Sequence, residues 1–200
     1  MNLDPEVAAV AQERYGITGE LSGSPIERVR QILEMGKVTL SVDGFIVTTV
    51  WLMRGDEVVD IQVPVWGDQA GKMLAMHDLA TRVQMLNADG FCLLGEVWTA
   101  PAPTAEQIRA GAKARARNHP DRTEGIHAFA ITKDGEFLSI VTPFRWEGEK
   151  LIVGGADAES SPSVLPLVQP IMRVWGIESP RAMDVSQWLG EEDHAEDPRP

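Results

Sequence analysis

The sequence is poor in cysteine and tyrosine, with one residue of each among its 200. A single cysteine excludes disulfide bonds within the chain. Cys92 lies in the apolar run Phe91–Leu94 without a basic neighbour in the sequence, and reactive thiols require electropositive surroundings. We therefore expect Cys92 to be a small buried hydrophobic residue.

Long hydrophobic runs are also missing. Apolar runs such as Phe45–Met53 are far shorter than the roughly 20 residues that a membrane-spanning helix needs. The amino terminus lacks the basic start, apolar stretch and small-residue cleavage site of a secretory signal. These absences predict a cytoplasmic protein without a membrane partner.

Sequence signatures of enzymes are scarce. There is no glycine-rich phosphate loop and no Gly-x-Ser-x-Gly nucleophile elbow. No Cys-x-x-Cys or His-x-x-x-His pair indicates a zinc site. The sequence therefore predicts no cofactor, and it favours a protein that is not an enzyme without deciding the question.

Charge is unevenly distributed in a chain whose formal net charge is −12. Seven acidic and two basic residues lie between positions 177 and 200, and we expect residues 191–200 to be an acidic disordered tail. Nucleic-acid binding depends on clustered Lys and Arg, so a nucleic-acid partner is not expected. The one basic cluster, Arg109–Arg122, is interpreted as the solvated face of a surface helix.

The composition, with 44% hydrophobic and 24% charged residues, is that of an ordinary globular protein. We predict a single globular domain over residues 1–190. The strongest helix signal is Ser24-Pro25-Ile26-Glu27, which combines an N-cap serine, a proline at the first position and a capping-box glutamate. Gly36 is expected to end that helix. Helices are predicted at 5–15, 25–35, 69–87, 104–117, 163–175 and 179–189.

Dense β-branched and aromatic residues predict strands in two groups. Asp43-Gly44 and Arg54-Gly55-Asp56 are expected to be turns of the first group, for which one long bulged strand is the alternative. The fold class is therefore α+β, with a mostly antiparallel sheet of about six or seven strands in two meanders, covered by helices. The predicted strands are Val38–Val42, Phe45–Met53 and Val58–Val65, then Phe91–Trp98 between the meanders, then Ile126–Ile131, Phe137–Arg145 and Leu151–Gly154.

Two short segments provide the candidate site. Glu96 stands two residues before Trp98 at a strand end, and Pro120-Asp121-Arg122-Thr123-Glu124 leads into the next strand. This pattern resembles a group of uncharacterised bacterial and phage proteins over about Lys72–Pro143, and departs from it at Val97, where a smaller alanine is expected. The resemblance implies a fold and an origin but no activity.

The candidate residues support two interpretations. In the first, Arg122 pairs with Glu96 and stacks on Trp98, forming a structural lock, because a carboxylate in an apolar strand needs a partner. In the second, a divalent metal is held by Glu96, His119, Asp121 and Glu124 and activates water. The positive charge of Arg122 opposes the second interpretation, and no metal is predicted.

Three functions from different classes follow. We favour a non-enzymatic accessory or interaction protein of bacterial or phage type that binds an unknown protein partner. The alternatives are a metal-dependent hydrolase built on Glu96, His119, Asp121 and Glu124, and an acidic decoy that mimics nucleic acid. Six tryptophans and exposed sheet edges also permit a homodimer.

Overall fold

The computed structural model describes residues 5–16, 21–101, 119–159 and 166–178. Two predicted helices, 104–117 and 179–189, and the predicted tail 191–200 lie outside these ranges. The described elements, in chain order, are α1 (Pro5–Tyr15), α2 (Pro25–Asp43), β1 (Thr49–Arg54), β2 (Glu57–Gln62), α3 (Gln69–Met85), β3 (Gly90–Thr99), β4 (Thr123–Thr132), β5 (Phe137–Glu147), β6 (Lys150–Val153), β7 (Asp157–Glu159), η3 (Pro166–Val168) and α5 (Gln169–Val174).

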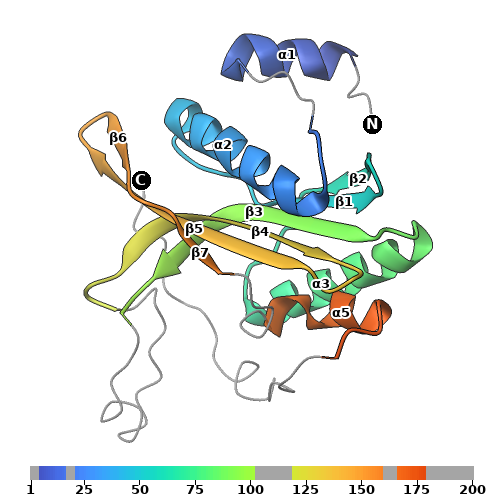
Figure 1. Cartoon of the computed structure of the whole chain (residues 1–200). Coiled ribbons are helices and arrows are strands. Elements are labelled where there is room, and N and C mark those ends of the chain that lie inside the picture. Colours follow the sequence, from blue (N-terminus) through green and yellow to red (C-terminus); the bar gives the residue numbers. More distant parts are fainter. Residues whose placement is uncertain (1–4, 17–20, 102–118, 160–165, 179–200) are drawn as a thin grey trace, which may run out of the picture.

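The strands form one seven-stranded antiparallel sheet in the order β2-β1-β3-β4-β5-β6, with β7 paired to the other part of β5. The α2 helix covers one face of this sheet, and α3 and α5 cover the other, as Figure 1 shows. The predicted α+β class is therefore confirmed. The predicted position of β3, between an amino-terminal hairpin and the meander β4-β5-β6, is confirmed as well.

The first meander differs from the prediction, because Val38–Val42 is helical and not a strand. Gly36 does not end α2. It lies buried where a Cβ would come within 2.9 Å of the Leu94 methyl groups, so glycine here allows the helix to approach β3 closely. The helix continues to Asp43, and Gly44, at φ 80°, caps it by donating its N–H to the Leu40 carbonyl. Asp43-Gly44 is thus a helix terminus, and only β1 and β2 remain as a hairpin, joined by the predicted turn at Gly55 and Asp56.

Alternating side chains divide the core between the two faces of the sheet. On the α2 face, Ile32, Leu33 and Leu40 pack with residues such as Cys92 and Ala128. On the opposite face, Phe91 and Phe129 pack against α3 and α5. Helix α3 contributes Met76, Leu79, Ala80 and Val83 to this second part of the core, and all four are buried.

The carboxy-terminal part of the described chain is less regular than predicted. The described part of the helix expected at 163–175 is a short 3-10 turn, η3, followed by α5, and Pro170 lies in the first turn of α5, a position that suits proline. The Trp175 indole N–H donates to the Ala88 carbonyl at 2.9 Å, which anchors α5 beside β3. The short strand β7 was not predicted. No described helix is long and apolar enough to cross a membrane.

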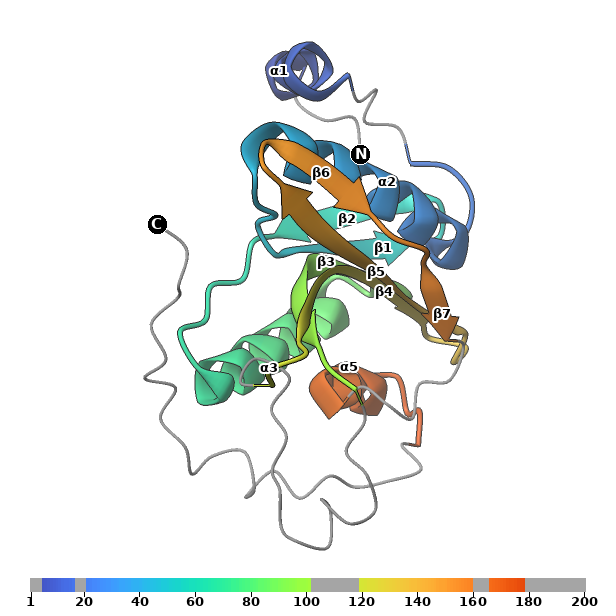
Figure 2. The ribbon, with the colours of Figure 1, turned by 90° about the vertical axis from the view of Figure 1, so that its left-hand side faces the viewer.

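Helix α1 lies outside these layers. It sits beyond α2, on the side away from the sheet, in both Figure 1 and the perpendicular view in Figure 2. Its position matches the prediction for residues 5–15, and Gly16 ends it with φ 66°.

Candidate functional site

The two sequence motifs meet where β3 ends and β4 begins. In the antiparallel register, Trp98 pairs with Glu124, and Glu124 pairs in turn with Phe144 on β5. Glu96 lies on the same face as Trp98, two residues earlier on β3, and this is the face that α2 covers. The sheet therefore brings Glu96, Trp98 and Glu124 together at one end, which sequence spacing alone did not establish.

Glu96 is half-buried and has a backbone partner. The N–H of Ile46 donates to Glu96 Oε1 at 2.6 Å. Ile46 belongs to the connection between α2 and β1 and is itself buried. The carboxylate therefore stabilises this connection against the end of β3, a role that the sequence analysis did not assign to it.

Arg122 stacks on Trp98. The guanidinium carbon lies 4.6 Å from the centre of the indole ring, within the range of a cation–π interaction. The stacking expected for these two residues is thus present, and Arg122 is exposed while Trp98 is half-buried. An ion pair between Glu96 and Arg122 stays a prediction.

His119 and Asp121 form a local turn before β4. The N–H of Asp121 donates to His119 Nδ1 at 3.1 Å, and the N–H of Arg122 donates to the His119 carbonyl at 3.2 Å. Within the described residues, which include Glu96 and Glu124, no three His, Cys, Asp or Glu side chains are grouped so that they could hold a metal ion. The two hydrogen bonds that His119 accepts hold the turn that carries Arg122.

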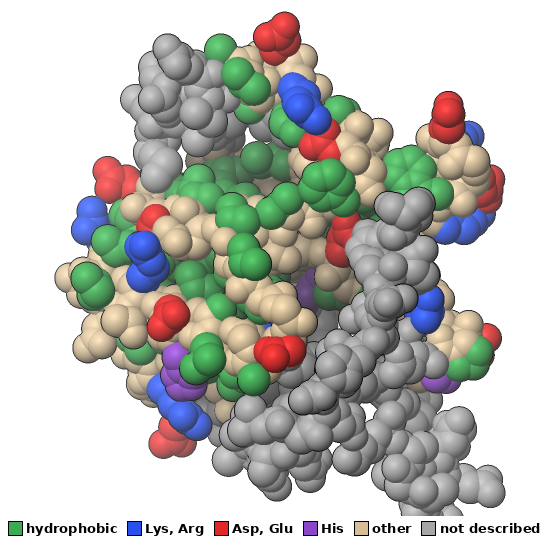
Figure 3. All heavy atoms as spheres, turned by 180° about the vertical axis from the view of Figure 1, so that it is seen from behind, with side chains coloured by type: hydrophobic (Ala, Val, Ile, Leu, Met, Phe, Trp, Pro, Cys, Tyr) green, Lys and Arg blue, Asp and Glu red, His purple; other side chains and the backbone are tan. Residues whose placement is uncertain are grey.

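Exposed hydrophobic side chains surround this end of the sheet. Trp146 is 38% exposed two residues after Phe144 on β5, and Val153, paired with Phe144, is 37% exposed. Phe45, in the connection between α2 and β1, is 51% exposed. Figure 3, the view from behind, shows hydrophobic side chains gathered on the surface beneath α1.

The family model described as bacteriophage lambda protein ea47 matches residues 1–192. The chain belongs to the phage lambda Ea47 family. No curated protein and no solved structure matches it. Membership in the Ea47 family supports the assignment to a phage-type protein. The matched residues include the whole candidate site, but the family description gives neither motif a role.

A buried polar pair on the other face of the sheet was missed by the sequence analysis. His127 Nε2 lies 2.8 Å from Ser139 Oγ, and both residues are 9% exposed. Burial lowers the pKa of His127 from its ordinary value of 6.5 to about 4, so the imidazole is neutral at pH 7. In the sequence, His127 shares one face of an apolar strand with Phe129 and Ile131, and this alternation was the pattern that indicated a buried histidine.

Arg28 was also missed. It lies on α2 with 1% exposure, and its Nη2 donates to the Asp56 carbonyl at 2.8 Å. Its Nε and Nη1 are buried without a hydrogen-bond partner among the described residues. Cys92 is buried, as predicted. Burial raises the pKa of its thiol, and the positive charge of Arg28 lowers that pKa by a smaller amount. Cys92 is therefore not an activated nucleophile.

Proposed function

We propose that this chain is a phage accessory protein that acts by binding another protein through the surface formed by Trp98, Arg122 and Trp146. The observation that carries this proposal is the stacking of the exposed Arg122 on Trp98 at 4.6 Å. Trp146, which is 38% exposed, lies on β5 two residues beyond Phe144, the residue that pairs with Glu124. We call Trp98, Arg122 and Trp146 the tryptophan surface.

Its composition is that of an interface centre. Tryptophan and arginine are the side chains most enriched among residues that dominate binding energy. Stacking on a ring restricts the guanidinium before a partner arrives, which lowers the entropy lost on binding. Trp98 and Trp146 both project from sheet strands, so the surface has a rigid support.

Charge indicates the kind of partner. The chain carries a formal net charge of −12, and Glu124 lies directly opposite Trp98 in the register. Two proteins with opposite surface charges associate faster, because their electrostatic fields steer them together. A protein partner with a positive surface therefore fits this chain better than an acidic one.

The test compares variants of the tryptophan surface with matched controls. Immobilised wild type, Arg122→Ala and Trp146→Ala are exposed to extracts of phage-producing cells, and bound proteins are identified by mass spectrometry. Leu74→Ala and Arg173→Ala, exposed residues on the helices of the opposite face, are the controls. We expect a protein that the wild type and both controls retain and that both surface variants lose. A set of bound proteins that is the same for all five forms, with equal thermal stability, contradicts the proposal.

A further inference from the structure

The tryptophan surface lies on one face of the sheet. Trp98 pairs with Glu124 in the register, Glu124 pairs with Phe144, and Phe144 belongs to the core on the α2 face. Side chains alternate along a strand, so Trp146, two residues beyond Phe144, points to the same face. Arg122, two residues before Glu124, stacks on Trp98. Both indoles and the guanidinium therefore lie on one side of the sheet, where a single partner segment can contact all three.

The register also sets the spacing of the two tryptophans. Strand β4 separates β3 from β5, so Trp98 and Trp146 lie two strand spacings apart across the sheet, about 9.6 Å, and two residues apart along it, about 6.6 Å. Their Cα atoms are thus about 12 Å apart. Each residue of a polyproline II helix advances about 3.1 Å, so residues three and four positions apart are separated by about 9 and 12 Å. A polyproline II segment of about four or five residues therefore spans both rings.

The polar groups of this surface are hydrogen-bond donors. An indole has one N–H donor and no acceptor, and a guanidinium has five donors and no acceptor. A proline-rich chain offers the complementary set, because proline lacks the backbone N–H but keeps its carbonyl acceptor. These carbonyls are free, since the polyproline II conformation has no internal hydrogen bonds. An α-helix uses its carbonyls within the helix. The surface therefore fits a proline-rich segment better than a helical one.

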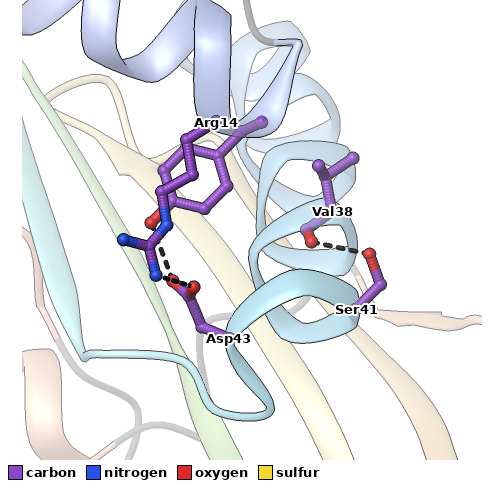
Figure 4. Close-up of polar contacts among 5 residues, drawn as sticks. Arg14, Val38, Ser41 and Asp43 are labelled. Carbon is purple, nitrogen blue, oxygen red and sulfur yellow. Dashed lines mark hydrogen bonds and ion pairs between the residues drawn. The ribbon is translucent and has the colours of Figure 1, made fainter. Parts of the chain in front are cut away.

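The carboxyl end of α2 lies at the same end of the sheet. The N–H of Ile46, three residues after the helix ends at Asp43, donates to Glu96 on β3. Asp43 itself accepts hydrogen bonds from Arg14 and Tyr15 of α1, and Figure 4 shows Arg14 reaching from α1 to this carboxylate. A basic residue of a partner would have to displace these donors in order to bind Asp43.

Two exposed acids border the tryptophan surface more directly. Asp121 immediately precedes Arg122, and Glu149 lies in the turn between β5 and β6. Glu147, by contrast, accepts two hydrogen bonds from Arg145, at 3.0 and 2.7 Å. Exposed carboxylates beside an apolar surface attract a lysine or arginine of the partner. The bound segment is therefore expected to be basic as well as rich in proline.

We propose that the tryptophan surface binds a segment of the partner that is rich in proline, adopts the polyproline II conformation and carries lysine or arginine. Its prolines pack on the rings of Trp98 and Trp146, Arg122 donates to a carbonyl of the segment, and Asp121 and Glu149 receive its basic side chains. Such a segment is already extended before binding and loses little conformational entropy. This inference rests on the proposed function and adds the chemistry of the partner.

Peptide binding to the full chain tests the proposal. A synthetic peptide of Pro-Pro-Lys repeats that carries a fluorophore is titrated with the wild type, and the dissociation constant is measured by fluorescence anisotropy. A peptide of Ala-Ala-Lys repeats, which has the same length and charge and keeps every backbone N–H, is the matched control. We expect the proline peptide to bind at least about tenfold more tightly than the alanine peptide. Equal dissociation constants, or tighter binding of the alanine peptide, overturn the proposal in favour of charge alone or of a helical segment.

Variants of the protein locate the binding site. Arg122→Ala and Trp146→Ala should each raise the dissociation constant of the proline peptide at least about tenfold, whereas Leu74→Ala should leave it unchanged. Arg122 is exposed, so its variant keeps the test valid even where Trp146→Ala lowers stability. The wild type should prefer Pro-Pro-Lys to Pro-Pro-Gln repeats, and the double variant Asp121→Asn, Glu149→Gln should bind both equally. Tight binding of the proline peptide to both surface variants, or a lysine preference that survives the double variant, overturns the proposed mode of binding.

Competition separates this inference from the proposed function. Excess Pro-Pro-Lys peptide is added to immobilised wild type that has retained a protein from the extract. We expect the peptide to release that protein, and the Ala-Ala-Lys peptide to leave it bound. A retained protein that depends on Arg122 and Trp146 but resists the proline peptide overturns the proline-rich segment and leaves the proposed function intact. The proposed function fails instead when the retained proteins do not depend on these two residues, and the peptide titration then still decides the binding chemistry of the surface.

Discussion

The backbone N–H of Ile46 donates a hydrogen bond of 2.6 Å to the side chain of Glu96, which lies 50 residues later in the chain. This contact joins the start of the first hairpin to the end of β3. Hydrogen bonds to charged groups contribute about 1.5–3 kcal/mol to stability. Glu96→Ala should therefore lower the free energy of unfolding by about that amount in urea titrations, and Glu96→Gln, which keeps an acceptor oxygen, by less. Equal urea midpoints for the wild type and Glu96→Ala would show that the contact is not stabilising.

The predicted ion pair between Glu96 and Arg122 is tested by a double-mutant cycle. Because Arg122 is exposed, the large cost of breaking a buried pair is not expected. A coupling free energy of about 0.2–1 kcal/mol between Glu96→Gln and Arg122→Met is the expected result. Coupling of several kcal/mol would mean that the pair is buried in solution, and zero coupling would show that the two side chains are independent.

Divalent metals should not stabilise the protein. Only a ligand that prefers the folded state raises the melting temperature, and no three carboxylate, thiol or imidazole groups among the described residues are arranged as ligands. Thermal unfolding with added Mg²⁺, Mn²⁺ or Zn²⁺ should match that of the untreated protein. A saturable, chelator-reversible rise that disappears in His119→Ala or Asp121→Ala would instead favour the metal-dependent hydrolase.

His127 should make stability depend on pH. Its pKa is about 4 in the folded protein and 6.5 by its ordinary value, so the unfolded chain binds an extra proton between these values. The contribution is fully present above pH 6.5 and is lost as pH falls toward 4. Between pH 7.5 and 4.5 the wild type should lose about 2–3 kcal/mol more than His127→Gln in urea titrations. The same loss in both proteins would assign the acid sensitivity to other groups.

Arg28 provides a test of an incompletely satisfied buried charge. Removing a buried charge in favour of an apolar side chain of similar shape is often neutral or stabilising. Arg28→Met should therefore leave the free energy of unfolding unchanged within about 1 kcal/mol or raise it, whereas Arg28→Ala should lower it by about 2–3 kcal/mol through loss of packing. If Arg28→Met is as unstable as Arg28→Ala, the guanidinium has partners that replace its missing hydrogen bonds.

Local signals predicted the elements whose ends depend on neighbouring residues. The capping box at Ser24 is formed as expected, and α3 begins at the predicted residue, Gln69. Strands β3, β4 and β5 follow their apolar and β-branched runs. These features were accessible because caps and hairpin turns use residues only a few positions apart.

Tertiary packing decided the remaining features. Val38–Val42 has a strand-like composition, yet it forms the last turns of α2, because there Leu40 is buried in the core between this helix and the sheet. Gly36 acts as a packing residue and not as a helix end because Leu94 lies against it. Three side-chain contacts join residues that lie between 12 and 50 positions apart. They are Ile46 with Glu96, His127 with Ser139, and Arg14 and Tyr15 with Asp43. The sequence by itself determined the local caps, turns and strand periods, whereas only the assembled sheet and its helices brought these distant partners together, because such contacts depend on the register and on helix placement.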